Sequence, residues 1–392
     1  MSGFFVFWGT SFGILFMEDF KVAVLVESAN AYSRGLLQGI AQYLWENGPW
    51  NIYYEERALD SPTPLWLKDW KGDGIIVRSQ TPVVTKAAVA TGAKVVDLSE
   101  TRLPGLPTIY HDYAASSRLA AEHLKEHFYQ NFGYVGIRGR YFSRVRQSAF
   151  CEILNGNVSV LELEPEDLQK NGLSGYKVLK DWLVNLPKPC GIMVCYDLVG
   201  IYVIQACRQA EIHVPEDVAV VGVNNDELQC RLSPVSLTSV AVNTFQSGYE
   251  AARLLHKLML GDPPPIHPTI IPVNQIVVRK STDSYAVSDS IVHQALQYIG
   301  KNACSGTTVQ GVAAALGVNR RLLERRFQKT MERTVHDKII RVQMNRANEL
   351  LQNTDLTLEV IAHRVGFANA SYFAAAYKKI YHQTPKKREQ KF

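Results

Sequence analysis

One pattern occurs twice near the C-terminus, and it constrains the fold more than any other feature of the chain. The first copy reads V-Q-G-V-A-A-A-L-G-V-N-R-R-L-L-E-R-R-F-Q-K over Val309–Lys329. The second reads L-E-V-I-A-H-R-V-G-F-A-N-A-S-Y-F-A-A-A-Y-K-K over Leu358–Lys379. In each copy a short apolar helix is followed by a glycine, Gly317 or Gly366, and then by a second helix that ends in aromatic and basic residues. This order predicts two helix-turn-helix units.

The basic charge of the chain is concentrated in the same region. The 392 residues carry a net charge of +5, but residues 285–392 hold 17 Lys and Arg against eight Asp and Glu. The rest of the chain holds 25 basic and 29 acidic residues and is slightly acidic. Because the basic excess coincides with regular helical patterning, it favours contact with double-stranded DNA over the alternative of a solvated tail.

The N-terminal segment and the cysteines exclude several classes of protein. Residues 1–16 are apolar but lack a basic leader and are too short to cross a bilayer. We expect them to be a non-native extension that precedes Met17, with a weak membrane-surface anchor as the alternative. The six cysteines form no C-x-x-C pair. They indicate core packing in a reducing compartment and no structural zinc. We expect a cytoplasmic protein with no cofactor and no membrane partner.

Residues 17–279 alternate between short apolar runs and runs with helical spacing. This alternation predicts an α/β domain, in which parallel strands are covered by helices on both faces. Because about 260 residues exceed one ordinary sheet, we expect two similar lobes with a cleft between them. Residues 280–288 are polar and are predicted to be a linker, followed by an all-α domain over 289–392. The predicted strands are 22–26, 52–54, 74–77, 94–97, 134–137, 191–195, 219–223 and 275–279, and the predicted helices of the first domain are 34–45, 83–91, 114–128 and 198–210.

Polar side chains follow several of the predicted strands. In parallel α/β sheets, ligands bind beyond the carboxyl ends of the strands. Carboxylates, amides, arginine and aromatic rings placed there suit a small polyol such as a sugar. Helix N-capping is the competing interpretation, above all for the aspartates. The candidate effector-binding residues from this pattern are Asn30, Tyr32, Arg34, Asp112, Arg146, Tyr196, Asp197 and Asn224.

The sequence gives little support for an enzyme. It contains no G-x-G-x-x-G after a strand, no phosphate-binding G-x-x-x-x-G-K, no G-x-S-x-G and no H-E-x-x-H. His111 and Asp112, together with Asp97, could form the acid/base site of a sugar-processing enzyme, but no nucleophile or metal partner accompanies these residues. We therefore expect no catalytic residues.

Three stretches of the first domain resemble the sensor of LacI-type repressors, which shares the fold of periplasmic sugar-binding proteins. They are R-V-R-Q-S-A-F (Arg144–Phe150), M-V-C-Y-D-L-V-G (Met193–Gly200) and V-P-E-D-V-A-V-V-G-V-N-N-D-E (Val214–Glu227). The resemblance implies that Arg146 and Asp197 contact the effector. It places Asn224 where the family carries a carboxylate, so one charge of the usual site is missing here.

The C-terminal repeats resemble the AraC-type DNA-binding domain. The matching stretches are A-N-E-L-L (Ala347–Leu351), I-A-H-R-V-G-F-A-N-A-S-Y-F (Ile361–Phe373) and Q-T-P-K (Gln383–Lys386). A LacI-like sensor placed before such a domain resembles the xylose-responsive branch of the AraC family. The resemblance implies a transcription regulator, expected to be an activator, with xylose or a related pentose as effector, a homodimeric state and contact with RNA polymerase. The alternatives are a repressor that senses another carbohydrate and a carbohydrate carrier.

The first recognition helix is predicted to read bases. Arg321, Glu324 and Arg325 lie about one turn apart, and arginine and glutamate can contact guanine and cytosine in the major groove. A salt bridge from Glu324 to a neighbouring arginine is the competing interpretation. Arg320 and Lys329 complete the exposed set of this helix.

The second recognition helix carries shorter groups, so we expect it to position the domain more than to specify a sequence. Its candidate DNA contacts are Asn369, Ser371, Tyr372, Lys378 and Lys379, with further phosphate contacts at Lys386, Lys387 and Arg388. A helix over 335–352, about 18 residues and ~27 Å long, joins the two repeats. This length allows both recognition helices to enter successive major grooves.

Overall fold

The computed structural model describes residues 20–58, 61–79, 82–99, 103–166, 173–283, 285–287, 289–354, 356–381 and 384–385. The predicted extension, residues 1–16, and the predicted phosphate contacts Lys386, Lys387 and Arg388 lie outside these ranges. The chain forms two compact units. Unit 1 ends at Ser116 and resumes over Ala241–Gln275, and unit 2 holds Ser117–Val240 together with the chain from Ile276 onward.

Unit 1 contains a four-stranded parallel sheet with the strand order β2-β1-β3-β4. Side chains of successive residues point to opposite faces of a strand. Val22 and Val24 therefore contact α1 and α9 on one face, while Ala23 and Leu25 contact η1 and α2 on the other. The elements are β1 (Lys21–Leu25), α1 (Ala31–Asn47), β2 (Asn51–Tyr54), η1 (Leu65–Asp69), β3 (Gly74–Val77), α2 (Pro82–Ala90), β4 (Lys94–Asp97) and α9 (Thr244–Met259), with a parallel pair of β5 (Ile109–His111) and β11 (Thr269–Ile271).

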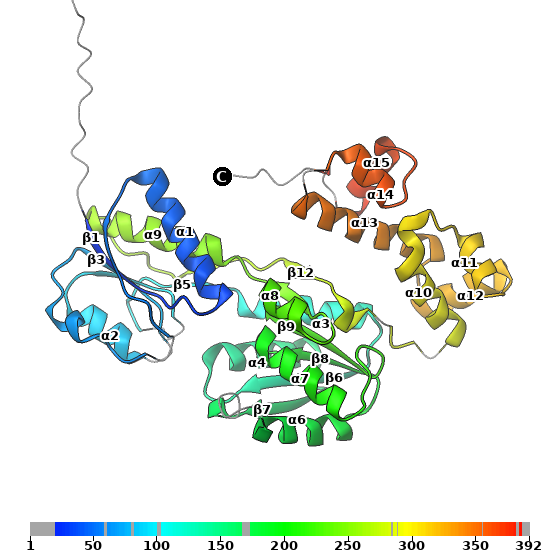
Figure 1. Ribbon diagram of the computed structural model, residues 1–392, viewed down its shortest axis with the longest axis horizontal. Coiled ribbons are helices and arrows are strands. Elements are labelled where there is room, and N and C mark those ends of the chain that lie inside the picture. The colour runs from blue at the N-terminus through cyan, green and yellow to red at the C-terminus, as the bar shows by residue number, and fades with distance from the viewer. Residues whose placement is uncertain are drawn as a thin grey trace, which may run out of the picture. The chain divides into compact units, whose positions relative to one another are not determined.

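Unit 2 begins with a second α/β layer around a six-stranded sheet of order β12-β10-β9-β8-β6-β7 (Figure 1). The pairs β6–β7, β6–β8 and β8–β9 are parallel. Its elements are α3 (Tyr113–Glu126), which starts in unit 1, β6 (Asn131–Ile137), α4 (Tyr141–Ile153), β7 (Val158–Leu163), α6 (Leu173–Asn185), β8 (Cys190–Val194), α7 (Asp197–Gln209), β9 (Val218–Asn224), α8 (Glu227–Leu232), β10 (Thr238–Ala241), β12 (Gln275–Val277) and η2 (Lys280–Thr282).

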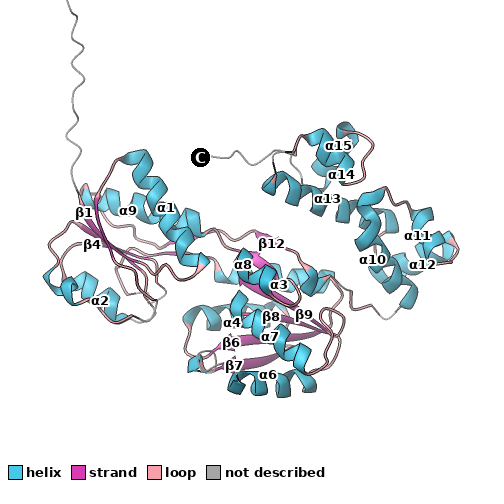
Figure 2. Cartoon of the chain, in the orientation of Figure 1, coloured by secondary structure: helices cyan, strands magenta, loops and turns pink. Residues whose placement is uncertain are grey.

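The described part of the chain beyond residue 289 is helical, as Figure 2 shows by the absence of magenta strands from it. Two hydrophobic cores share its long helix, α13. The first core joins α10, α11 and α12 to the start of α13, and the second joins α14 and α15 to its later turns. The elements are α10 (Ser290–Asn302), η3 (Ala303–Ser305), α11 (Val309–Ala315), α12 (Arg320–Met331), α13 (Val335–Asn353), α14 (Leu358–Arg364) and α15 (Ala370–Tyr381).

This architecture confirms the predicted fold class, an α/β sensor followed by a helical domain with two helix-turn-helix units. Both turn glycines have a left-handed backbone, with φ of 65° at Gly317 and 87° at Gly366. The start of the predicted linker is packed within the sensor, since Ser281 and Thr282 are buried and Ser281 Oγ donates to the carbonyl of Val220 over 2.6 Å. Below, residues 20–283 are called the sensor and residues 289–381 the helical domain.

Four cysteines behave as the sequence predicts. Cys190, Cys195, Cys207 and Cys230 are buried among apolar residues, and all six cysteines are free thiols. Burial raises the pKa of the Cys190, Cys195 and Cys207 thiols to about 12. These thiols stay protonated at neutral pH and pack as small hydrophobic side chains.

Candidate effector site and DNA-binding surfaces

A buried ion pair lies at the carboxyl end of the unit 1 sheet. Glu27 follows β1 and Arg78 follows β3, and Arg78 Nη1 contacts Glu27 Oε1. Arg78 also donates to Ser33 Oγ over 3.2 Å. The other carboxylate oxygen of Glu27 is buried and has no hydrogen-bond partner among the described residues. A buried acceptor without a donor is costly, so this oxygen is suited to a ligand hydroxyl.

Tyr32 lies over the same ion pair. The guanidinium of Arg78 stands 4.6 Å from the centre of the Tyr32 ring, and the Tyr32 hydroxyl is 3.1 Å from His111 Nδ1. The other nitrogen of His111 is 3.2 Å from Ser247 Oγ. Tyr32 thus contacts Arg78, which follows β3, and His111 of β5, while Ser247 of α9 holds His111 in turn. Glu27 and Arg78 were not among the predicted site residues, although each stands just beyond a predicted strand.

The remaining predicted residues of unit 1 have local structural partners. Asn30 Oδ1 accepts from Ser33 N over 2.8 Å and caps α1, and Asp112 Oδ1 accepts from Ala115 N over 2.9 Å at the start of α3. Arg34 Nη1 donates to the carbonyls of Ser28 and Ala29. Asn30 and Asp112 therefore each use a side-chain oxygen to cap a helix, as the capping interpretation predicts. Arg34 stabilises the loop after β1.

Arg146 and Tyr196 lie at the corresponding edge of the unit 2 sheet. Arg146 on α4 is buried, and its Nη1 donates to the carbonyl of Cys195, which directly follows β8. Its guanidinium is 5.5 Å from the ring centre of Phe142, and the Tyr196 ring packs edge-on against the same phenylalanine at 6.1 Å. Burial raises the pKa of the Tyr196 hydroxyl, which therefore stays a donor at neutral pH.

Asp197 is 1% exposed, and its carboxylate connects three elements. Asp197 Oδ1 accepts from Ser239 Oγ over 2.5 Å, and Oδ2 accepts from the backbone N–H of Asp226 over 2.8 Å. Burial raises the pKa of Asp197 to about 7, against the opposing effect of these two donors. Asp197 therefore ties the start of α7 to the chain segments that follow β9 and form β10.

Asn224, at the end of β9, has an unusual backbone for a non-glycine residue, with φ of 105°. Its Oδ1 is buried and has no hydrogen-bond partner among the described residues. The next residue, Asn225, is held by Arg279, whose Nη2 donates to Asn225 Oδ1 over 2.7 Å. Positive φ values at such positions are maintained by their surroundings and concentrate at binding sites. Asn224 thus offers a fixed acceptor at this edge.

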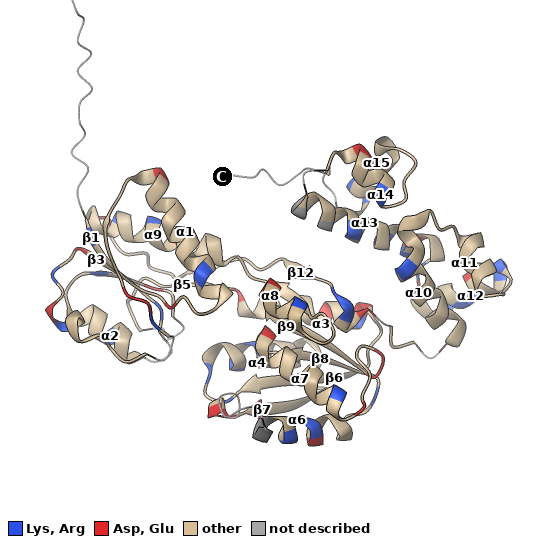
Figure 3. Cartoon of the chain, in the orientation of Figure 1, with Lys and Arg blue, Asp and Glu red and all other residues tan. Residues whose placement is uncertain are grey.

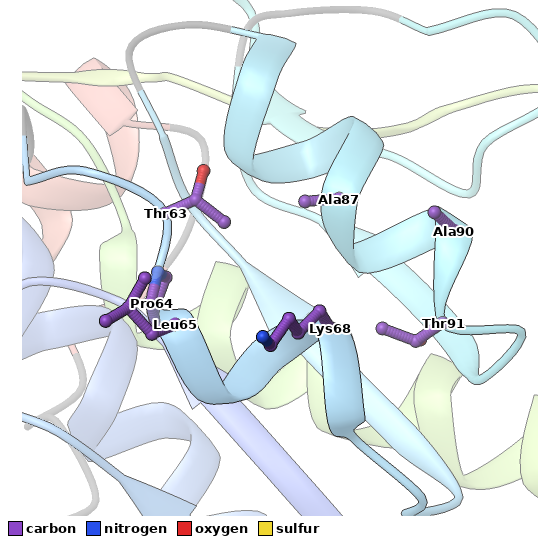
Figure 4. A pocket seen from close by; sticks show the side chains of 7 residues that line it. All are labelled: Thr63, Pro64, Leu65, Lys68, Ala87, Ala90 and Thr91. Carbon is purple, nitrogen blue, oxygen red and sulfur yellow. The ribbon is translucent and has the colours of Figure 1, made fainter.

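A hollow of about 380 Å³ lies elsewhere in unit 1, between η1 and α2 (Figure 4). Its lining includes none of the predicted effector residues. Lys68 supplies its only charge, and most of the exposed lining surface is apolar, so it lacks the convergent polar groups that a sugar requires. The lining residues are Thr63, Pro64, Leu65, Lys68, Ala87, Ala90 and Thr91.

Helix α12 is the recognition helix of the first helix-turn-helix unit, and it presents a basic face. Arg320, Arg321 and Arg325 are exposed while Leu323 and Phe327 are buried in the first core. Arg320 Nε contacts Glu324 Oε1 at 3.1 Å, which is the salt bridge considered as the alternative for Glu324. Figure 3 shows basic residues on α10, α12 and α13. Lys329 is also exposed, near the end of α12.

Helix α15 is the recognition helix of the second helix-turn-helix unit, and it exposes different groups. Asn369 Oδ1 accepts from Tyr372 N over 3.0 Å and caps the helix, while the Tyr372 ring is 71% exposed. Phe373 and Tyr377 are buried, as predicted. The remaining predicted DNA contacts, Ser371, Lys378 and Lys379, are exposed.

The described ranges contain neither a metal-binding cluster nor a membrane-spanning helix. No group of three or more His, Cys, Asp or Glu side chains there is arranged to hold a metal ion. None of the helices described is long and apolar enough to cross a membrane.

Comparison with known families identifies the class of protein. Residues 121–282 match the periplasmic binding protein-like domain, and residues 312–390 match a helix-turn-helix domain. Sensors of this fold carry their ligand groups at strand ends, where Glu27 and Asn224 lie here and where Arg146 of α4 contacts the carbonyl of Cys195. The combination defines a sugar-responsive, DNA-binding transcription regulator.

Full-length relatives make the identification specific. The chain is 32% identical to the xylose operon regulatory protein of Escherichia coli (strain K12) over 390 residues, covering 95% of this chain and 97% of that protein. It is 33% identical to the xylose operon regulatory protein of Haemophilus influenzae over 388 residues, covering 94% and 98%. A solved structure of the xylose-binding transcription activator XylR aligns with a TM-score of 0.61 and 31% identity, covering 93% of this chain and 96% of that one. The chain belongs to the family of xylose operon regulatory proteins.

Proposed function

We propose that the protein is a transcription activator that responds to xylose or a related pentose. The observation that carries this proposal is the 32% identity to a xylose operon regulatory protein along both domains in the same order. The solved relative is described as a xylose-binding transcription activator. A repressor that senses another carbohydrate is the alternative, and the departure at Asn224 is the feature that favours a different sugar.

Polar groups at the strand ends of each unit are the candidates for sugar recognition. Glu27 Oε2 and Asn224 Oδ1 are acceptors without donors among the described residues, so each can accept from a sugar hydroxyl. Tyr32 and Tyr196 supply aromatic faces and hydroxyls, and Arg146 supplies a fixed donor. Asn30, Arg34, Asp112 and Asp197 would act mainly by holding these groups in place, because their side chains contact other parts of the protein.

DNA recognition would be divided between the two recognition helices. We assign base contacts on α12 to Arg321 and Arg325, and phosphate contacts to Arg320, Lys329, Lys378 and Lys379. Glu324 would orient Arg320 rather than read cytosine, because the two side chains are paired. Asn369, Ser371 and Tyr372 would place the start of α15 against the groove.

A homodimer bound to DNA would present two copies of the helical domain and would recruit RNA polymerase. Sugar binding would shift the population of sensor conformations, and the DNA spacing that the dimer favours would change with it. A coupling of about 1–3 kcal/mol between sugar and DNA is enough for such a switch.

Thermal-shift screening tests the effector assignment. Xylose should raise the melting temperature, with ribose, arabinose and glucose as matched comparisons, because a ligand that binds the folded state stabilises it. A shift with glucose and none with any pentose would overturn the assignment. Asn224→Ala should abolish the xylose shift, whereas Ser371→Ala, in the helical domain, should leave it unchanged.

Arg146→Ala tests the site within unit 2. Because Arg146 also donates to the carbonyl of Cys195, its loss can lower stability as well as affinity. Calorimetric titration with xylose at a temperature where the variant remains folded separates the two effects. A variant that binds xylose as the parent does would remove Arg146 from the proposed site.

A further inference from the structure

The end of α3 in the sensor contacts the segment that leads into the helical domain. The backbone N–H of Ala286 donates to the carbonyl of His127 over 2.9 Å. The His127 ring stacks on the Tyr285 ring, with the centroids 4.6 Å apart and the planes 6° from parallel. Such a parallel stack fixes the orientation of Tyr285 relative to α3.

Lys338, in the second turn of α13, completes this contact from the side of the helical domain. Its ammonium stands 4.2 Å from the centre of the Tyr285 ring and donates to the Tyr285 hydroxyl. Burial lowers the pKa of Lys338 to about 8, although Glu126 and Asp283 oppose the shift. Because burial disfavours the charged form, an ammonium held at this position makes a specific contact, unlike a lysine that projects into water.

Two more contacts join the same elements. Arg341, one turn further along α13, pairs with Glu126 at the end of α3, with 3.9 Å between nitrogen and oxygen. Phe128 has a left-handed backbone with φ of 66°, and its ring packs against the first core of the helical domain. We call Glu126, His127, Phe128, Tyr285, Lys338 and Arg341 the junction.

The junction reaches the first recognition helix through a shared core. Phe128, Tyr285 and Val287 pack on the cluster that contains Leu323 and Phe327 of α12. Within the described residues, the second core contains only side chains of the helical domain. A displacement at the end of α3 would therefore act on α12 before it acts on α15.

Helix α3 also contacts other parts of the sensor at several points. His123 Nε2 is 2.8 Å from Thr282 Oγ1, and Ser117 Oγ donates to the backbone carbonyl of Arg146 over 2.8 Å. The helix starts directly after Asp112, and its 14 residues span about 21 Å. One helix thus contacts the proposed sugar-site residue Arg146 and ends at the junction.

We propose that the junction is the coupling contact of this regulator, through which α3 transmits the sugar-bound state of the sensor to the first helix-turn-helix unit. The inference rests on the proposed function, because it concerns how that same response reaches DNA. Glu126, His127 and Phe128 form the sensor side, and Tyr285, Lys338 and Arg341 form the receiving side. Neither side contacts base or sugar in this assignment.

The test measures coupling separately from binding. Lys338→Met keeps the aliphatic stem, removes the ammonium and is expected to fold. Lys301→Met removes the same charge from an exposed position on α10 and serves as the matched control. A duplex selected from a random pool by the wild-type protein in xylose is then titrated with each protein, with and without xylose. Thermal shift with xylose is recorded in parallel.

We expect xylose to change the DNA dissociation constant of the wild type and of Lys301→Met by at least about 5-fold. In Lys338→Met this ratio should fall to within about 2-fold of unity, while the xylose thermal shift stays as in the wild type. Tyr285→Leu should give the same result. A Lys338→Met protein that retains the wild-type ratio overturns the proposal.

A second measurement keeps the junction testable if xylose is not the effector. Coupling is reciprocal, so DNA alone should slow amide exchange over residues 123–128 in the wild type. The slowing should disappear in Lys338→Met. Equal slowing in both proteins, or in neither, overturns the junction, whereas the absence of any pentose thermal shift counts against the proposed function alone.

Discussion

The two helix-turn-helix halves share one sequence pattern but differ in what they expose and in what they contact. The first presents Arg321 and Arg325 on α12, and its core receives Phe128 from the sensor. The second presents Ser371 and Tyr372 on α15, and its core is made within the helical domain. This difference supports the proposed division of roles, in which the first half reads bases and receives the signal while the second holds position on DNA.

The turn glycines should show the largest difference between the halves. A Cβ at Gly366 would stand 3.1 Å from the backbone of both Cys304 and Gly306, whereas at Gly317 it would meet nothing within 4 Å. Gly366→Ala should cost about 2–5 kcal/mol from left-handed strain plus overpacking, and Gly317→Ala about 1–2 kcal/mol from strain alone. Urea unfolding measures both. Equal losses would contradict this asymmetry.

The junction should make stability depend on pH through Lys338. Its pKa is about 8 in the folded protein, against 10.5 as the ordinary value, so the unfolded chain binds more protons between these values. The free energy of unfolding should therefore rise as pH increases from about 8, by up to about 3 kcal/mol at about 1.36 kcal/mol per pKa unit. Glu126, Asp283, His127 and Tyr285 surround the ammonium.

The pH prediction is checked by urea unfolding between pH 7.5 and 10. Lys338→Met should give a flatter profile than the wild type because the titrating group is gone, and Lys301→Met should reproduce the wild-type profile. Identical profiles for the two variants would show that Lys338 is not a buried ammonium.

A substitution on the first recognition helix should weaken sequence preference, whereas a substitution on the second should largely preserve it. Arg325→Ala should cost about 1–3 kcal/mol of DNA binding and relax the preference at one base pair, because a bidentate arginine is replaced by a methyl group. Tyr372→Ala should change affinity without relaxing any single position. Selection from a random DNA pool measures both, and a sharper loss of sequence preference for Tyr372→Ala would reverse the assignment.

The smallest expected effect lies in the phosphate contacts of the second half. Lys379→Ala should lower the salt dependence of binding by about one unit in the log–log slope, uniformly across sequences. DNA titrations at several salt concentrations between about 50 and 200 mM measure this slope. A variant with an unchanged slope would indicate that α15 stands away from the backbone.

Much of this division was predictable from the sequence because helical periodicity and turn glycines are local signals. The buried faces at Phe327, Phe373 and Tyr377 follow from spacing alone, and so do the left-handed turns. The strand β7, V-S-V-L-E-L, was not predicted despite its alternation, and α9 was missed although Asn243 caps it and its apolar residues have helical spacing. Both signals were present in the chain.

The site was less predictable because its roles depend on tertiary contacts. Asn30 and Asp112 were expected to bind the effector, yet their side chains cap helices. The sequence alone does not distinguish an amide or carboxylate oxygen that caps a helix from one that binds a ligand. Glu27 and Arg78 meet only because β1 and β3 are neighbours. The junction joins Glu126 to Arg341, which are far apart in the sequence, and no local pattern points to it.

The long helix α13 has a consequence for how operators can vary. Its early side chains belong to the first core and its later ones, from Met344, to the second, so no hinge separates the two halves along it. Adding one residue to its middle would rotate one half by about 100° about the helix axis and turn its recognition helix away from the shared face of the duplex. If the two recognition helices enter successive grooves as proposed, a single rod of protein sets the distance and phase between those grooves, and evolution can retune them only in steps of whole turns.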